Sequence, residues 1–106
     1  MSTSLFEAVR LVAPTLSAAQ RRVLDALLFA PDHSASAGEL RTILRLSAVV
    51  EVNAEVGRIG RKLYKLMGTN PDGLSSGEFE WWHMLATGEL TKVRGFVWTL
   101  REEVVR

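Results

Sequence analysis

The chain contains no cysteine among its 106 residues, which excludes disulfides, thiolate metal sites and a cysteine nucleophile. No apolar run approaches the ~18 residues that a membrane helix needs, so no membrane association is expected. The N-terminal stretch MSTSLFEAVR carries Glu7 where a secretion signal would carry basic residues. Together these absences favour a protein of the cytoplasm.

Residue patterns typical of catalysis are also missing. His33 and His83 have no metal-ligand partner at i+3, i+4 or a similar spacing. No glycine-rich phosphate loop follows an expected strand, and neither Ser47 nor Ser76 has an adjacent base in a recognisable arrangement. We therefore expect no enzymatic activity in this chain, and no metal or cofactor.

What the chain does contain is an uneven distribution of charge. Its length, with 47% hydrophobic and 24% charged residues, predicts a single globular domain over 1–106 with a small core. The net charge is only +1, but residues 41–66 hold six basic and two acidic groups. Such a local basic segment is the electrostatic pattern of phosphate contact, although a solvated helix face has the same composition.

Four helices are expected, over residues 5–13, 18–29, 37–44 and 49–67. Capping-box spacing marks the first three starts, at Ser4, Ser17 and Ser36. Pro14 ends the first helix, and Gly68 is well placed as the C-cap of the fourth. Helical periodicity predicts the inward-facing residues of the first three: Leu5, Val9, Val12, Val23, Leu24, Leu27, Leu28, Leu40, Ile43 and Leu44.

The fourth helix separates an apolar stripe from a cationic face. The predicted stripe comprises Val52, Val56, Ile59, Leu63 and Leu66. At 100° per residue, Arg58, Arg61 and Lys65 lie opposite this stripe, and Lys62 flanks them. Gly57 and Gly60 each cost about 1 kcal/mol of helix propensity. Close approach of another helix is the favoured reason for them, and close approach of a phosphate backbone is the alternative.

The region after residue 68 predicts a loop and a hairpin. Residues 69–77 are turn-rich, and residues 96–100 (FVWTL) form a strand by propensity. Residues 78–86 fit either a strand or a helix that starts from a Ser75–Glu78 capping box. The strand is favoured, because residues 87–95 would then close a hairpin. The ending REEVVR resembles the first turn of a further helix, which suggests a piece of a longer protein.

These elements predict a mainly α fold with a small antiparallel β-hairpin, arranged as a winged helix-turn-helix. The turn of the motif falls at residues 45–48, the recognition helix spans about 49–67, and the wing spans about 78–100. The expected partner is double-stranded DNA. The expected DNA-binding residues are Arg58, Arg61, Lys62, Lys65, Arg45, Lys92 and Arg94.

Aromatic residues suggest a second kind of contact. Trp81, Trp82 and His83 are candidates for stacking on a base, because one of two neighbours on a strand faces outward. Core packing is the favoured use of tryptophan.

Three segments carry a resemblance to a known family: residues 47–68 (SAVVEVNAEVGRIGRKLYKLMG), 80–89 (EWWHMLATGE) and 95–104 (GFVWTLREEV). They resemble the N-terminal module of bacterial HNH-type restriction endonucleases, many of which are suspected to act on modified DNA. The resemblance covers roughly residues 36–106. It implies a DNA-reading domain joined to a nuclease, with a modified base as a candidate target. The chain itself carries no HNH motif, so any cleavage would belong to another domain.

A winged-helix module that binds protein, as an adaptor, a dimerisation domain or an inhibitor, is the alternative, because folds of this type serve both roles.

Overall fold

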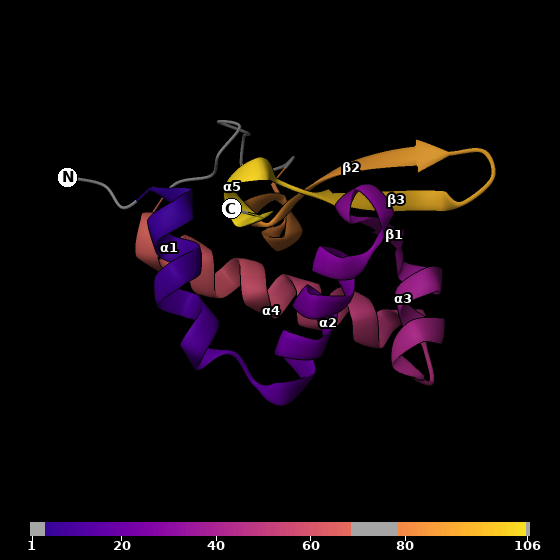
Figure 1. The fold of residues 1–106 in the computed structure, drawn as a ribbon, viewed down its shortest axis with the longest axis horizontal. Coiled ribbons are helices and arrows are strands. Elements are labelled where there is room, and N and C mark those ends of the chain that lie inside the picture. The colour runs from indigo at the N-terminus through magenta and orange to yellow at the C-terminus, as the bar shows by residue number, and fades with distance from the viewer. Residues whose placement is uncertain (1–3, 69–78, 106) are drawn as a thin grey trace.

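The computed structural model describes residues 4–68 and 79–105. The fold is mainly helical with one small antiparallel sheet (Figure 1). The chain runs through α1 (Leu5–Val12), α2 (Ala18–Phe29), β1 (Ser34–Ser36), α3 (Ala37–Leu44) and α4 (Val49–Met67), and then through β2 (Ala86–Thr91), β3 (Gly95–Leu100) and α5 (Glu102–Val105). Short 3₁₀ turns occupy η1 (Ala13–Thr15), η2 (Pro31–His33) and η3 (Trp81–Met84).

Local sequence signals explain where the helices begin and end. The Ser17 and Ser36 capping boxes are complete, and the Ser4 hydroxyl accepts from the Glu7 backbone N–H. Gly68 ends α4 in the left-handed conformation, at φ 72°. The predicted bounds of α2, α3 and α4 are therefore confirmed. α1 ends one residue earlier than expected, because a 3₁₀ turn that contains Pro14 begins at Ala13.

The core gathers around α4, because α1, α2 and α3 all pack against it. Val52, Val56, Ile59 and Leu63 are buried as predicted. Leu66 was predicted to be buried and is exposed, because Met67 packs against the core in the last turn of α4. Ile43 was also predicted to face inward and is 59% exposed, because Leu40 and Leu44 fill the core-facing row of the short helix α3.

The sheet has the strand order β1–β3–β2, with both pairs antiparallel. Ala35 lies opposite Trp98, and Gly88 lies opposite Trp98 on the other side. The β2–β3 hairpin projects past α3 at one end of the molecule, while α1 and α5 lie at the other (Figure 1). β1 thus joins the hairpin to the helical layer.

The hairpin exists, but its first strand differs from the predicted one. Residues 78–86 were expected to pair with residues 96–100. Instead, residues 81–84 form η3, and the strand that completes the hairpin with β3 is β2, which lies in the predicted loop 87–95 except for Ala86. The predicted loop 69–77, Glu78 and the Ser75–Glu78 capping box lie outside the described residues. The helix expected from REEVVR is present as α5.

Close packing of η3 on α4 explains why residues 81–84 are not a strand. Gly60 is buried, and a Cβ atom built on it would lie 1.9 Å from the Trp81 carbonyl oxygen. Only glycine leaves room for that contact. Gly60 is therefore a site of close packing, but its neighbour is a 3₁₀ turn and not the helix that was expected, and Gly57 makes no comparably close contact with a described residue.

The two α4 glycines should respond oppositely to alanine. Gly60→Ala forces its methyl group into backbone, and we expect a loss of roughly 1–3 kcal/mol of unfolding free energy. At Gly57 the nearest described atom outside the local helix backbone is Trp81 Cβ, 4.0 Å from a built Cβ, so Gly57→Ala should be neutral or should stabilise by up to about 1 kcal/mol. Urea unfolding of both variants measures this difference. Equal stability of the two would contradict the close contact.

Candidate nucleic-acid interface

Three cations lie on the outer face of α4. Arg58, Arg61 and Lys65 are all exposed, opposite the buried stripe as predicted. Arg58 forms an ion pair with Glu55 on the same helix, which offsets part of its charge. Arg61 and Lys65 have no ion pair within the part of the chain that the structure describes. These two are therefore the uncompensated cations of this face.

The first turn of α4 has a different character. Glu51 is exposed there, and the Ser47 hydroxyl donates to its Oε1 at 2.6 Å. Val50, one position earlier, is 68% exposed. The positive charge of the helix surface consequently belongs to its second half.

Lys62 serves the fold. Its Nζ donates to the Thr15 carbonyl oxygen and to Gln20 Oε1, both at 2.9 Å. Gln20 Oε1 also accepts from the Ser17 backbone N–H in the capping box of α2. Lys62 thus ties α4 to the start of α2 and is only partly exposed. Sequence spacing places Lys62 beside the cationic face, but its ammonium already donates two hydrogen bonds within the fold.

The α3–α4 turn holds Arg45 in the left-handed conformation, at φ 56°. Its backbone N–H caps α3 by donating to the carbonyl oxygens of Arg41 and Thr42. Glycine is the usual residue at such a left-handed position. The Arg45 side chain that stands there is exposed. Arg41, which the sequence pattern does not single out as a site residue, is exposed on the preceding turn.

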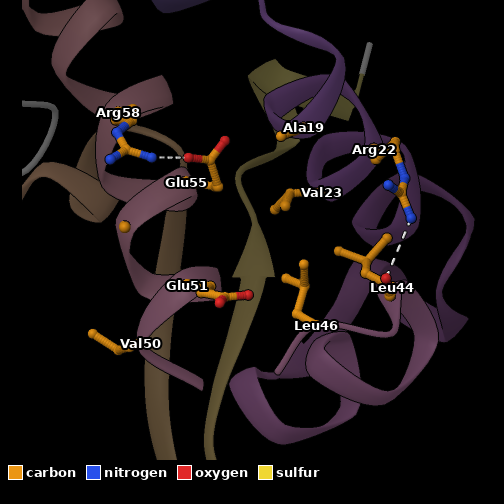
Figure 2. Close-up of a pocket in the computed structure, with 10 residues that line it drawn as sticks. Ala19, Arg22, Val23, Leu44, Leu46, Val50, Glu51, Glu55 and Arg58 are labelled. Carbon is orange, nitrogen blue, oxygen red and sulfur yellow. Dashed lines mark hydrogen bonds and ion pairs between the residues drawn. The ribbon is translucent and has the colours of Figure 1, made fainter. Parts of the chain in front are cut away.

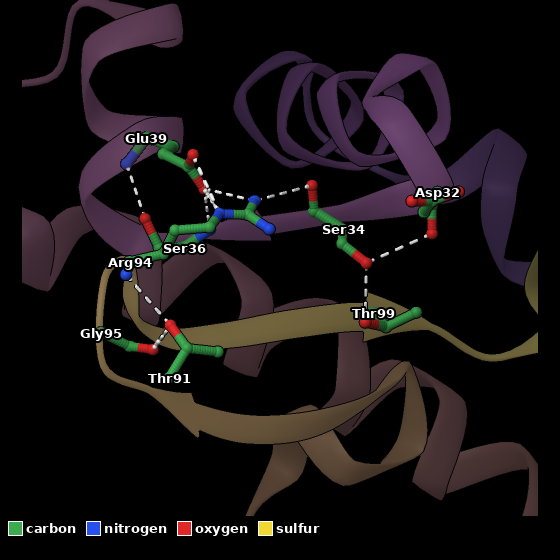
Figure 3. Close-up of polar contacts among 8 residues, drawn as sticks. All are labelled: Asp32, Ser34, Ser36, Glu39, Thr91, Arg94, Gly95 and Thr99. Carbon is green, nitrogen blue, oxygen red and sulfur yellow. Dashed lines mark hydrogen bonds and ion pairs between the residues drawn. The ribbon is translucent and has the colours of Figure 1, made fainter.

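The hairpin turn carries Lys92 and Arg94, and the structure gives them different roles. Lys92 is exposed. The Arg94 guanidinium reaches α3, where Nη2 lies 2.6 Å from Glu39 Oε1 and Nε lies 3.2 Å from both carboxylate oxygens (Figure 3). Nη2 also donates to the Ser34 carbonyl oxygen at 3.4 Å. We refer to this Arg94–Glu39 contact as the latch, since it joins the hairpin turn to α3.

The latch shifts the pKa of both partners. Hydrogen bonds from Arg94 and from the Ser36 backbone stabilise the ionised carboxylate, so the pKa of Glu39 lies below its ordinary value. The carboxylate in turn raises the pKa of Arg94. Of the two predicted wing cations, only Lys92 therefore carries charge that no described residue balances.

An aromatic groove of about 1060 Å³ lies between α4 and the hairpin. Val49, Asn53 and Gly57 of α4 form its helix wall. Ala37 and Glu80 also line it, together with six aromatic side chains: Tyr64, Phe79, Trp81, Trp82, Phe96 and Trp98. Trp98 is 4% exposed, and its Nε1 is buried with no hydrogen-bond partner among the described residues. Sequence reasoning did not include Asn53 or Phe96 in a site, because only the packing of η3 brings these elements together.

The three predicted stacking residues differ in their availability. Trp81 is 41% exposed. Trp82 is half-buried, donates from Nε1 to Glu80 Oε2 at 2.5 Å, and stacks on the His83 ring at a centroid distance of 3.8 Å. The Glu80 backbone N–H donates to His83 Nδ1 at 2.9 Å. Trp82 and His83 are thus engaged with each other and with Glu80, and Trp81 is the open ring of the three.

A second cleft, of about 390 Å³, lies between α2 and α4 (Figure 2). Its lining is mostly apolar and includes Val23, Leu44, Leu46 and Val50. Arg22 closes one side and donates to the Leu44 carbonyl oxygen at 3.2 Å.

No group of three or more His, Asp or Glu side chains that could hold a metal occurs within residues 4–68 and 79–105. In the same residues, no helix combines the length and hydropathy that crossing a lipid bilayer requires. Comparisons with family models, with curated proteins and with solved structures find no match to this chain. The resemblance to HNH-type restriction enzymes therefore stays a prediction.

The latch should contribute to stability in a pH-dependent way. Glu39→Gln removes the charge but keeps an oxygen for the Ser36 backbone N–H, because glutamine also serves in a capping box. The lowered pKa means that ionised Glu39 stabilises the fold above its ordinary value of 4.5, and that this contribution is lost as pH falls through the folded-state pKa. On acidification, the thermal midpoint should fall further in the wild type than in Glu39→Gln.

Arg94→Gln provides the matched partner for a double-mutant cycle by circular dichroism. Above the titration range of the carboxylate, either single variant should lower the midpoint, and the double variant should lower it by less than the sum of the two. Additive effects, or parallel pH curves for wild type and Glu39→Gln, would show that the latch does not stabilise the fold.

Proposed function

We propose that the protein is a winged helix-turn-helix module that binds double-stranded DNA in the cytoplasm. The element order supports this: α3 and α4 are joined by the short turn at residues 45–48, and the β2–β3 hairpin follows them as a wing. β1 precedes α3 and pairs with β3, so the wing lies beside the helix pair.

The observation that carries the proposal is the exposure of Arg61 and Lys65 on the outer face of α4 without an ion-pair partner among the described residues. They take no part in the core or in a cap, so packing does not require their charge. Cations held on a rigid helix attract phosphates and release condensed counterions on binding. Arg61 can also form bidentate contacts with a guanine edge, whereas Lys65 suits phosphate.

Two further cations extend the proposed interface. Arg45 lies in the α3–α4 turn and Lys92 in the hairpin turn, and both are exposed. Contacts of this kind fix the register of a protein on the duplex without reading its sequence. Arg94 acts indirectly, because the latch holds the turn that presents Lys92. Arg58 joins the interface with its charge partly offset by Glu55.

The proposed module would guide a nuclease in the same chain or in another chain, as the family resemblance implies. A modified base is a candidate target.

Binding of a protein partner is the second candidate, and one observation favours it. The cleft between α2 and α4 is mostly apolar, and Val50, which lines it, is 68% exposed (Figure 2). Such surfaces often mark protein contacts. A partner helix in this cleft would not require Arg61 or Lys65.

Replacing Arg61 and Lys65 together with alanine should weaken duplex binding and leave the thermal midpoint nearly unchanged. The slope of log affinity against log salt should flatten by about 1 unit for each phosphate that the variant no longer neutralises. Fluorescence anisotropy with a labelled duplex at several salt concentrations measures both the affinity and the slope.

The matched control is Arg10→Ala with Arg21→Ala, which removes the same charge from exposed positions on α1 and α2. Its binding should stay close to wild type. If the two double variants bind equally, the outer face of α4 is not the interface. If the wild type binds no duplex, the DNA-binding proposal is wrong.

A further inference from the structure

The aromatic groove and the exposed cations belong to one continuous strip of α4. Val49, Asn53 and Gly57 form the helix wall of the groove, and Arg61 and Lys65 continue the same i, i+4 row. Residues four apart on a helix are neighbours, about 5–6 Å between Cβ atoms. Arg61 therefore follows directly after the groove wall, so a ligand that fills the groove has a cation beside it.

Two of the rings that line the groove offer unstacked faces. Trp81 meets Tyr64 and Phe79 at interplanar angles of 69° and 85°, and it is 41% exposed. Edge contacts of this kind leave a ring face without a parallel partner.

Phe96 repeats this arrangement on the hairpin. It meets Trp82 and Trp98 at 71° and 81°, and it is also 41% exposed. Trp82, by contrast, lies nearly parallel to His83, at 23°. The groove thus presents one open ring from η3 and one from β3.

Polar groups at the groove suit the edge of a heteroaromatic ring. Asn53 is exposed on the helix wall, and its amide supplies both a donor and an acceptor. Glu80 and Trp98 also line the groove: the Glu80 carboxylate accepts from Trp82 Nε1, and Trp98 Nε1 is a buried donor without a partner among the described residues. A hydrocarbon chain would use none of these groups.

We propose that the aromatic groove receives one nucleobase unstacked from the bound DNA, held against the faces of Trp81 and Phe96 with its edge toward Asn53. The inference rests on the proposed DNA binding. The base enters the groove while its phosphate stays near Arg61. No covalent step is involved.

A base that is already unpaired costs less to unstack than a paired one. Wild type should therefore bind a duplex with a single-nucleotide bulge about tenfold more tightly than the fully paired duplex, within the range that one base–aromatic stack supplies. Phe96→Ala should remove most of this preference and leave the affinity for the paired duplex nearly unchanged. Competition anisotropy with both duplexes measures the ratio.

Leu90→Ala is the matched control. Leu90 lies opposite Phe96 in the hairpin, is 78% exposed and does not line the groove, so this variant should keep the preference. Gly57→Leu is a second, independent variant, because Gly57 lines the groove with a built Cβ 4.0 Å from Trp81 Cβ, and a leucine there should block entry of a base. Thermal midpoints confirm that each variant is folded.

The outcomes separate the two proposals. Loss of the bulge preference in Phe96→Ala and Gly57→Leu, with retention in Leu90→Ala, supports the inference. Wild-type binding of both duplexes with equal affinity overturns the inference and leaves DNA binding intact. An equal reduction of the preference in Phe96→Ala and Leu90→Ala also overturns it, since the hairpin surface and not the groove would then carry the preference. Failure of wild type to bind either duplex overturns both proposals.

Discussion

The contact between Gly60 and the backbone of Trp81 is the constraint on which the second half of the structure depends. A carbonyl oxygen can lie this close to a helix only where no Cβ stands in the way. Once Trp81 is seated on α4, η3 follows the helix surface and directs the chain into β2. Gly88 then leaves space for the Phe96 and Trp82 rings above the strand, since a Cβ there would lie 2.3 Å from Phe96 Cζ. The aromatic groove is the space that these two close approaches leave between α4 and the hairpin.

Local signals predicted the helices well, and they failed where long-range packing decided the structure. The bounds of α2, α3 and α4 follow from capping residues and apolar periodicity, which are properties of short windows. In contrast, residues 79–85 alternate in a way that also fits a strand, and the contact at Gly60 overrides that propensity. The stretch ATGELT of β2 has little β propensity of its own, and it is a strand because β3 pairs with it.

The contrast between local sequence signals and long-range packing also applies to the candidate interface. Periodicity alone places Arg58, Arg61 and Lys65 on the outer face of α4, because the core fixes the opposite face. Periodicity does not reveal that Lys62 bonds to Thr15, 47 positions away, or that Arg94 pairs with Glu39, 55 positions away. Such partners decide which cations keep an unbalanced charge. The interface that follows is smaller than the set of basic residues suggests, and it depends on the latch to hold the hairpin turn in place.

The two glycines of α4 show how one helix serves both packing and the proposed binding. Each costs about 1 kcal/mol of helix propensity relative to alanine. At Gly60 the contact with Trp81 offsets that cost, because the packing of η3 requires it. At Gly57 no described residue outside the local helix backbone comes closer than 4.0 Å to a built Cβ, so the described packing gives no reason to avoid a side chain. A local cost without a structural gain is expected where a surface must stay open for a ligand. Gly57 lies in the helix wall of the groove, one turn before Arg61, and an open wall at that point is what entry of a planar ring beside a phosphate-binding cation requires.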